Sequence, residues 1–209
     1  MAVAVLGYHQ AMKFSGHAFI LAAICAVADT PAMAETIPRN ASIIDDLSRE
    51  APAASIGTPW QLFTDQVMGG VSTGTMSREV FGGRLAIRML GDVRLENNGG
   101  FVQMALDLSP DSAMVDASAW SGVELDLYGD DQEYGVHLRT SDLKRPWQSY
   151  RQNFTAAPKW QTVRLPFVGF NVHRAEIPLD LRRLRRLGIA AIGRAFSADI
   201  AIGGLRFFS

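Results

Sequence analysis

Hydrophobic and polar positions alternate with a period of two along most of the chain from Trp60 onward. Leu85, Ile87 and Met89, for example, are each separated by one small or charged residue. The same alternation recurs in residues 123–127, 134–138, 160–165 and 200–208. Clusters of Gly, Asp, Asn or Pro separate the runs, and short alternating runs bounded by turn residues are typical of strands. This pattern predicts one all-β domain, a β-sandwich or barrel.

Only the segment Leu179–Leu187 has a pattern that suits a helix, so the domain is expected to contain at most one short helix. Leucines recur every three residues, and four arginines between them would form a basic opposite face. These arginines are Arg182, Arg183, Arg185 and Arg186. A solvated face of one covering helix is the commoner meaning of such a pattern. The alternative is peripheral contact with anionic lipid headgroups or with an acidic partner.

The first 34 residues have the three parts of a secretory signal peptide. Lys13 precedes an apolar run at Ala18–Ala28, and a small-residue motif, Ala32-Met33-Ala34, ends the segment. The run is too short to span a bilayer, which takes roughly 20 apolar residues. Cleavage after Ala34 is therefore predicted, with export to the periplasm or the medium. Residues 1–11 form an upstream extension if translation starts at Met12.

The exported chain divides into a lead-in and a domain. Residues 35–58 mix Pro, Ala, Ser and charges, and their apolar pair Ile43-Ile44 can form one edge strand. Residues 59–209 carry the alternating pattern and form the predicted β-sandwich. No transmembrane segment is expected in the mature chain.

The cysteine and histidine content and the net charge argue against several classes of function. Cys25 is the only cysteine and lies inside the apolar leader, so the mature chain is expected to have no disulfide, catalytic thiolate or thiolate metal site. The net charge of −1 gives no electrostatic reason to expect nucleic acid binding. Two histidines remain, His137 and His173, at a spacing that suggests neither a base nor a metal pair. No catalytic residue, metal or cofactor is predicted, and His137 is expected to face solvent.

The stretch Thr64–Gly74, TDQVMGGVSTG, has the glycine spacing of a phosphate loop, but Thr75 stands where the lysine would be. The better interpretation is a glycine-rich turn. In it, Val67, Met68 and Val71 are expected to pack inward while Asp65 accepts hydrogen bonds from backbone amides.

Three other loops offer candidate binding groups. Asn97–Gly100 reads as a hairpin turn that needs positive φ, which Asn and Gly tolerate. Asp130 and Asp131 suit either a solvated turn or a calcium loop, and the turn is favoured. The aromatic residues of the segment 134–160 suit either the core or stacking on sugar rings, and Trp147 is expected to be the exposed one.

Seven ordered blocks of sequence carry a resemblance to a known family. They are WQLFTDQVMGGVS at Trp60–Ser72, FGGRL at Phe81–Leu85, NNGGF at Asn97–Phe101, WSGVELDLYGD at Trp120–Asp130, YGVHLR at Tyr134–Arg139, WQTVRLPF at Trp160–Phe167 and LGIAAIGRAF at Leu187–Phe196. Together they resemble the complex I intermediate-associated protein 30 domain, the family of NADH:ubiquinone oxidoreductase assembly factors. The resemblance implies a galactose-binding-like jelly-roll sandwich and a non-enzymatic role in assembling a membrane complex.

These observations predict a non-catalytic periplasmic β-sandwich that binds a protein partner during assembly of a membrane complex. The family resemblance implies that this complex belongs to the respiratory chain. The alternative is a carbohydrate-binding module for an envelope or environmental glycan. The candidate binding residues are Asp65, Met68, Gly69, Gly70, Ser72, Asn98, Gly99, Gly100, Tyr134, Arg139, Trp147 and Tyr150.

Overall fold

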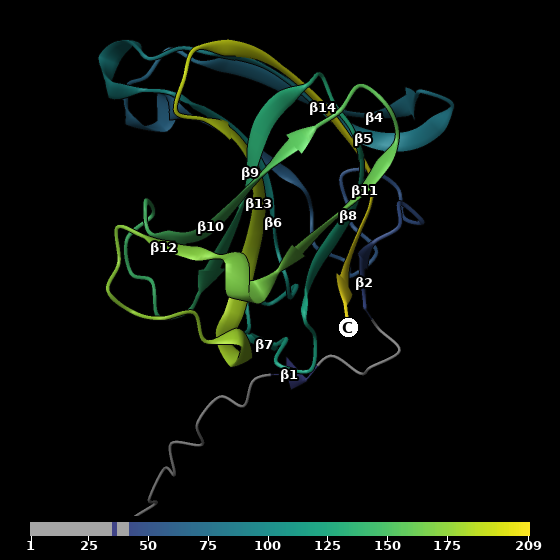
Figure 1. The fold of residues 1–209 in the computed structure, drawn as a ribbon, viewed down its shortest axis with the longest axis vertical. Coiled ribbons are helices and arrows are strands. Elements are labelled where there is room, and N and C mark those ends of the chain that lie inside the picture. The colour runs from purple at the N-terminus through teal and green to yellow at the C-terminus, as the bar shows by residue number, and fades with distance from the viewer. Residues whose placement is uncertain (1–34, 37–41) are drawn as a thin grey trace, which may run out of the picture. The chain divides into compact units, whose positions relative to one another are not determined.

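The computed structural model of the chain describes residues 35–36 and 42–209, and they form an all-β sandwich of two sheets (Figure 1). The predicted fold class is confirmed. The predictions for the signal peptide and its cleavage fall on residues 1–34, which lie outside the described part. Within that part, no helix is both long and apolar enough to cross a membrane.

The first sheet, sheet A, contains the central strands β6, β13 and β9. Its hydrogen-bonded order is β3 (Gln61–Thr64), β6 (Phe101–Asp107), β13 (Leu184–Ile192), β9 (Gln132–Thr140), β10 (Ser149–Ala156) and β12 (Asn171–His173). Two short strands, β1 (Glu35–Thr36) and β7 (Val115–Asp116), continue it beside the start of β13. Apart from the pair β1–β7, neighbouring strands are antiparallel.

The second sheet, sheet B, is antiparallel throughout. Its order is β11 (Gln161–Pro166), β8 (Gly122–Tyr128), β14 (Phe196–Phe208), β5 (Arg84–Val93) and β4 (Thr73–Phe81). The lead-in contributes β2 (Ile43–Asp45), which pairs with the end of β14. The apolar pair Ile43-Ile44 therefore does form a strand.

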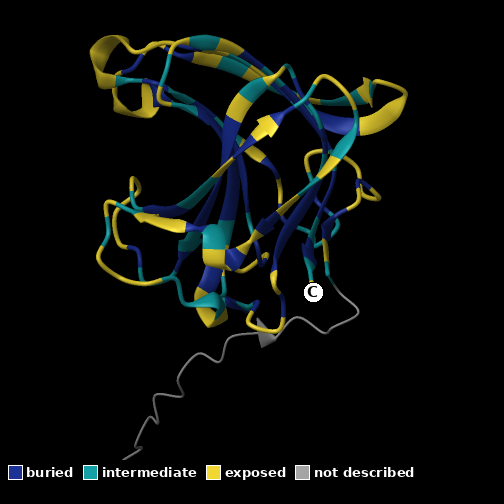
Figure 2. Ribbon diagram, viewed as in Figure 1, coloured by how far each residue is buried: buried dark blue, intermediate teal, exposed yellow. Residues whose placement is uncertain are grey.

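The core lies between the sheets, where alternate residues of each strand point inward, as Figure 2 shows by the buried segments in both layers. Val102, Met104 and Leu106 of β6 face it from sheet A, and Ile87 and Met89 of β5 face it from sheet B. Burial of this alternating apolar set is the main driving force for the sandwich.

The segment Leu179–Leu187, the one candidate for a helix, does not form an α-helix, which agrees with the expectation of at most one short helix. A single 3-10 turn, η4 (Leu181–Arg183), leads directly into β13. The pairing of β13 with β9 shifts register between Leu184 and Arg186, so Leu184 and Leu187 are both buried although three residues separate them. A β-bulge thus reproduces the leucine spacing of a helix.

The arginines of this segment do not form the predicted basic helical face. Arg182 pairs with Asp180, Arg183 with Asp142, and Arg186 with Asp107. Their charge is therefore partly compensated within the chain, and peripheral membrane contact stays a prediction.

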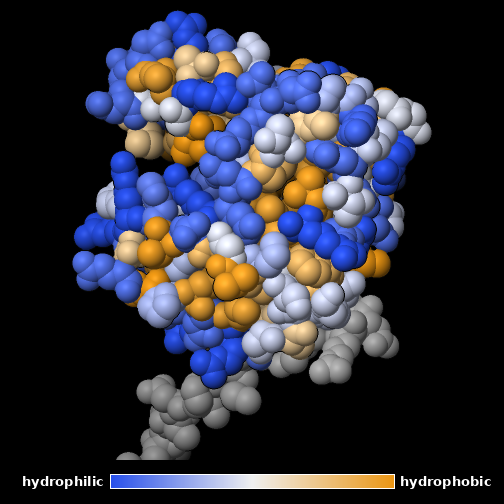
Figure 3. All heavy atoms as spheres, in the orientation of Figure 1, coloured by the Kyte–Doolittle hydropathy of each residue, from blue (hydrophilic) through white to orange (hydrophobic). Residues whose placement is uncertain are grey.

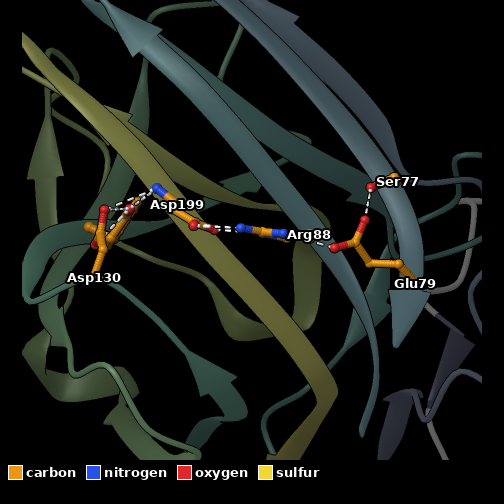
Figure 4. A network of polar contacts seen from close by, with 6 residues as sticks. Ser77, Glu79, Arg88, Asp130 and Asp199 are labelled. Carbon is orange, nitrogen blue, oxygen red and sulfur yellow. Dashed lines mark hydrogen bonds and ion pairs between the residues drawn. The ribbon is translucent and has the colours of Figure 1, made fainter. Parts of the chain in front are cut away.

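A polar network fastens the outer face of sheet B (Figure 4). Arg88 of β5 donates two 2.7 Å hydrogen bonds to Asp199 of β14 and one of 2.9 Å to Glu79 of β4. The backbone N–H of Asp199 in turn donates to Asp130 and to the Tyr134 hydroxyl, at 3.0 and 2.9 Å. Because the carboxylate of Asp130 is occupied by these protein donors, the solvated-turn interpretation suits it better than a calcium loop.

Candidate functional site

Asp65 is the centre of the loop that carries the most distinctive motif of the sequence. It begins the 3-10 turn η1 (Asp65–Met68), and its side chain is fully buried. The carboxylate accepts hydrogen bonds from the N–H of Ser72 at 2.9 Å, the N–H of Phe101 at 3.3 Å, the N–H of Gly100 and the hydroxyl of Ser72. The prediction that Asp65 binds backbone amides is confirmed.

The electrostatics of Asp65 follow from this arrangement. Burial by itself would raise the pKa of the carboxyl group, but the hydrogen bonds from Ser72, Gly100 and Phe101 outweigh it and lower the pKa. The group is therefore a carboxylate at neutral pH. Since its lone pairs are used inside the loop, it positions the backbone and does not touch the surface.

The glycines of the motif make room for this carboxylate. A Cβ on Gly70 or on Gly99 would overlap the Asp65 side chain, and Gly69 has a φ of +90° that other residues rarely adopt. Asp65 thus ties the η1 loop to the turn at η2 (Glu96–Asn98), where Asn97 and Asn98 have positive φ as predicted. That turn joins β5 of sheet B to β6 of sheet A and is not a hairpin.

The prediction that Val67, Met68 and Val71 pack inward is wrong. Val67 is 74% exposed and Met68 is 63% exposed, while Val71 and the nearby Leu95 are also exposed. The inward position is taken by Asp65, so the residues after it in the turn point outward. We call Val67, Met68, Val71 and Leu95 the apolar knob. The turns that contain it lie at the upper left of Figure 1, and in Figure 3 hydrophobic atoms reach the surface in that lobe.

A groove runs over the outer face of sheet A. Its cavity has a volume of about 380 Å³, and the residues lining it include His137, Arg151, Asn153, Asn171 and Ile192. Gly135 of β9 has no side chain and lies beside His137 and Asn153, whereas farther along the sheet the side chain of Gln103 of β6 covers Gly188. In Figure 3 the surface is hollowed between the upper-left and lower-left lobes, on the sheet A side of the sandwich.

His137 lies in this groove and does not face open solvent, so that prediction is wrong. The residue is only 6% exposed and its Nε2 atom has no hydrogen-bond partner among the described residues. Burial, with Arg151 and His173 nearby, lowers the pKa of His137 to about 3. The imidazole is therefore neutral at physiological pH.

The predicted aromatic site separates into core and surface. Tyr134 and Tyr150 are buried, with their hydroxyls donating to Asp130 and to the carbonyls of Ile177 and Pro178. Neither ring reaches a ligand at the surface, so their place in the predicted site is wrong. Trp147 is 50% exposed, which confirms that it is the aromatic residue of this set at the surface.

Arg139 has a structural role. Its guanidinium donates to the carbonyl oxygens of Arg145, Pro146 and Gln148 at 2.6–2.9 Å, and so braces the loop that presents Trp147. By strand register, this loop lies at one end of sheet A and the η1 loop at the other. The structure therefore brings together the predicted residues of η1 and η2 but places Trp147 apart from them, with the groove between.

Sequence reasoning missed the groove residues. Alternation does place Arg151 on the face opposite Tyr150, and His137 opposite Val136. It does not reveal that β9 and β10 are neighbours with His137 beside Arg151, because strand order is not encoded in local periodicity. Metal ligation is not indicated: the described residues contain no cluster of three or more His, Cys, Asp or Glu that could hold an ion.

Comparison with solved structures supports the fold. A family 11 carbohydrate-binding module from Clostridium thermocellum, in complex with a β-1,3-1,4-mixed-linked tetrasaccharide, has a TM-score of 0.63 at 12% identity, covering 80% of this chain and 95% of the module. A family 11 module of a cellulosomal cellulase of that organism has a TM-score of 0.62 at 12% identity, covering 80% and 93%. A family 30 module from C. thermocellum has a TM-score of 0.50 at 15% identity, covering 65% and 82%. At these identities the likeness concerns the fold alone.

Sequence comparison identifies the family. No curated protein sequence matches the chain. The profile described as complex I intermediate-associated protein 30 (CIA30) matches residues 50–201, which include the Asp65 loop, the groove strands and the network around Arg88. The chain belongs to the complex I intermediate-associated protein 30 family.

Proposed function

We propose that the protein is a non-catalytic, exported β-sandwich that binds a protein partner during assembly of a membrane complex. The observation that carries this proposal is the apolar knob held on a rigid base. Exposed Val67 and Met68 stand on a turn whose conformation Asp65 secures through four hydrogen bonds. Apolar anchors on a preorganised loop lose little conformational entropy on binding, which is how small patches become energetic centres of interfaces.

The family description supports a protein partner, because it names association with an intermediate of complex I. A non-catalytic role is supported by the state of the polar side chains near the loop and in the groove. The hydroxyl of Ser72 is buried and committed to Asp65, so it is no nucleophile. His137 is buried and neutral without a partner that would make it a catalytic base.

Site-specific photocrosslinking tests the proposal. A photoreactive amino acid at Met68 should capture a defined protein from envelope membranes. The same group at Val168, which is 96% exposed on η3 (Phe167–Gly169), is the matched control. Capture of the same proteins at both positions, or of none at Met68, would contradict a docking role for the knob.

A second comparison uses substitution. Val67→Ser with Met68→Ser should reduce capture without a change in thermal stability, since exposed side chains contribute little to folding. Val80→Ser, at a site 72% exposed on β4, is the control for loss of an exposed apolar side chain.

Export is part of the proposal and has its own test. Fractionation of the source cells should recover the mature chain outside the cytoplasm, with Glu35 as its first residue. An intact N-terminus in the cytoplasmic fraction would refute export and the predicted cleavage after Ala34.

The second candidate function is glycan binding in the groove of sheet A. Its support is the groove itself, which is lined by amide, imidazole and guanidinium groups, together with carbohydrate-binding modules among proteins of similar fold. Titration with a β-1,3-1,4-mixed-linked tetrasaccharide, followed by NMR, should shift the signals of groove residues. Shifts confined to the apolar knob, or none at millimolar ligand, would exclude this candidate.

A further inference from the structure

Most arginines on the outer faces of the two sheets have acidic partners, including Arg186 on sheet A, which pairs with Asp107. On sheet B, Arg88 binds Asp199 and Glu79, Arg164 binds Glu124, and Arg206 binds Glu124 and Asp126. These guanidinium groups are neutralised by carboxylates of neighbouring strands. These arginines on the outer face of sheet B therefore already have carboxylate partners within the chain.

Arg151 in the groove of sheet A is different. It is partly buried, and its one side-chain hydrogen bond runs from Nε to the Ser149 hydroxyl at 2.8 Å. None of the ion pairs formed by residues 42–209 includes it. Burial and the nearby Arg174 lower the pKa of Arg151, yet it remains a cation at every physiological pH. Its terminal NH₂ groups are thus positively charged donors without an acidic partner.

The two residues that pair with Arg151 across the sheet are neutral. In the register of sheet A, Arg151 is flanked by His137 of β9 and Asn171 of β12. The Nε2 atom of His137 has no partner and would lie 3.2 Å from a Cβ placed on Gly135, so it is directed over the groove floor. A buried polar nitrogen without a partner is unfavourable by about 1–3 kcal/mol. A ligand group that reaches Nε2 would remove that penalty.

Two asparagines add acceptors at the groove wall. Asn153 donates its amide N–H to Glu133 at 3.0 Å, and Asn171 donates to the carbonyl of Gly169 at 3.2 Å. These bonds use the amide nitrogens and leave the amide oxygens as acceptors. The groove wall thus combines one guanidinium group, that of Arg151, with several neutral groups that can hydrogen-bond to hydroxyls.

We propose that this groove binds a saccharide that carries a carboxylate, a uronate residue, with the guanidinium of Arg151 on the carboxylate and His137, Asn153 and Asn171 on hydroxyls. The inference rests on the second candidate function, glycan binding, and specifies in addition that the bound sugar is negatively charged. A planar carboxylate matches the guanidinium fork in a two-point contact. The absence of a side chain at Gly135 leaves room beside His137 and Asn153, and the amide acceptors suit a ligand rich in hydroxyls.

The test compares an acidic ligand with its neutral form. The full mature chain is titrated with trigalacturonate and with its methyl ester, and binding is followed by calorimetry and NMR. The acid should bind at least about tenfold more tightly than the ester, a difference of about 1.4 kcal/mol for one charge-assisted contact. Arg151→Gln should abolish that preference, whereas Arg151→Lys should retain part of it.

Arg49→Gln is the control for loss of one positive charge, because Arg49 is exposed in the lead-in and takes no part in the groove. Amide spectra of each variant establish that it is folded. Equal binding of acid and ester, or an unchanged preference in Arg151→Gln, would overturn the role of Arg151 while leaving glycan binding intact. Absence of binding by both ligands would overturn both. Equally tight binding of hexaglutamate would show that the site reads acidic peptides and would also overturn the proposal.

Discussion

Replacement of Asp65 by asparagine is the sharpest test of how the η1 loop is built. The substitution keeps the shape of the side chain but removes its charge and turns one acceptor oxygen into an NH₂ donor. Oδ1 of Asp65 accepts from the N–H of Ser72, and Oδ2 accepts from Gly100, Phe101 and the Ser72 hydroxyl. The least harmful orientation of the new amide side chain keeps its oxygen at the Oδ2 position, so the N–H of Ser72 is left facing another donor.

The magnitude follows from these contacts. One buried unsatisfied N–H costs about 1–3 kcal/mol, and the other hydrogen bonds lose the extra strength that a charged acceptor provides, for a total of about 2–4 kcal/mol. In a domain of this size each kcal/mol lowers Tm by about 2–4 °C, so Tm should fall by about 5–15 °C. Urea unfolding followed by tryptophan fluorescence, with Asp131→Asn as control, measures the difference. Asp131 is exposed and has a φ of +62°, which asparagine tolerates.

The pH dependence gives a second readout. The hydrogen bonds lower the folded-state pKa of Asp65 below its unfolded value of about 3.9. Its contribution to stability is therefore present at neutral pH and is lost as the pH falls through the folded-state pKa. The stability gap between wild type and Asp65→Asn should shrink below about pH 4. A gap no larger than that of Asp131→Asn, or one that does not change in acid, would refute the account of the loop.

Three further predictions concern other parts of the sandwich. The pKa of His137 is about 3 in the folded chain and about 6.5 in the unfolded chain. The free energy of unfolding of wild type should therefore fall by about 2 kcal/mol between pH 7 and about pH 5, and this fall should be absent in His137→Gln; an equal fall in wild type and variant would contradict this. Gly70→Ala should destabilise the domain more than Gly83→Ala, since a Cβ at Gly70 would overlap the Asp65 side chain, whereas alanine at Gly83 meets open space and has only the strain of a φ of +78°, about 1 kcal/mol; equal urea midpoints for the two variants would show that the loop can accommodate the added methyl group. Arg139→Gln should speed amide exchange around Trp147, because three carbonyls lose their donor; unchanged exchange there would show that the loop is held by other contacts.

The alternation of hydrophobic and polar residues was enough to predict the fold class, because the periodicity of a strand depends only on residues close together in the sequence. Alternation of inward and outward residues correctly divided Tyr150 from Arg151 and assigned most segments to strands. It failed at Leu179–Leu187, where leucines three residues apart fit a helix equally well. The register shift after Leu184 brings both Leu184 and Leu187 to the core, and such a bulge depends on the pairing with β9.

The candidate site was less accessible to local reasoning. The motif around Asp65 could be recognised as a turn, but its hydrogen bonds to the backbone of Gly100 and Phe101 could not be predicted. The outward direction of Val67 and Met68 could not, because it follows from burial of Asp65 against Gly100, a residue 35 positions away. A loop's apolar residues pack inward only when the interior has room for them, and here the carboxylate occupies it.

The amino-acid sequence by itself determined the all-β class, the glycine-rich turn and the family, since each depends on residue type at fixed short spacing. Tertiary structure alone decided which side chains meet. It placed His137 beside Arg151, left that arginine without a carboxylate among the described residues, and laid the side chain of Gln103 over Gly188. Strand order and register control those contacts, and both arise from packing of the whole sandwich, which no single segment specifies.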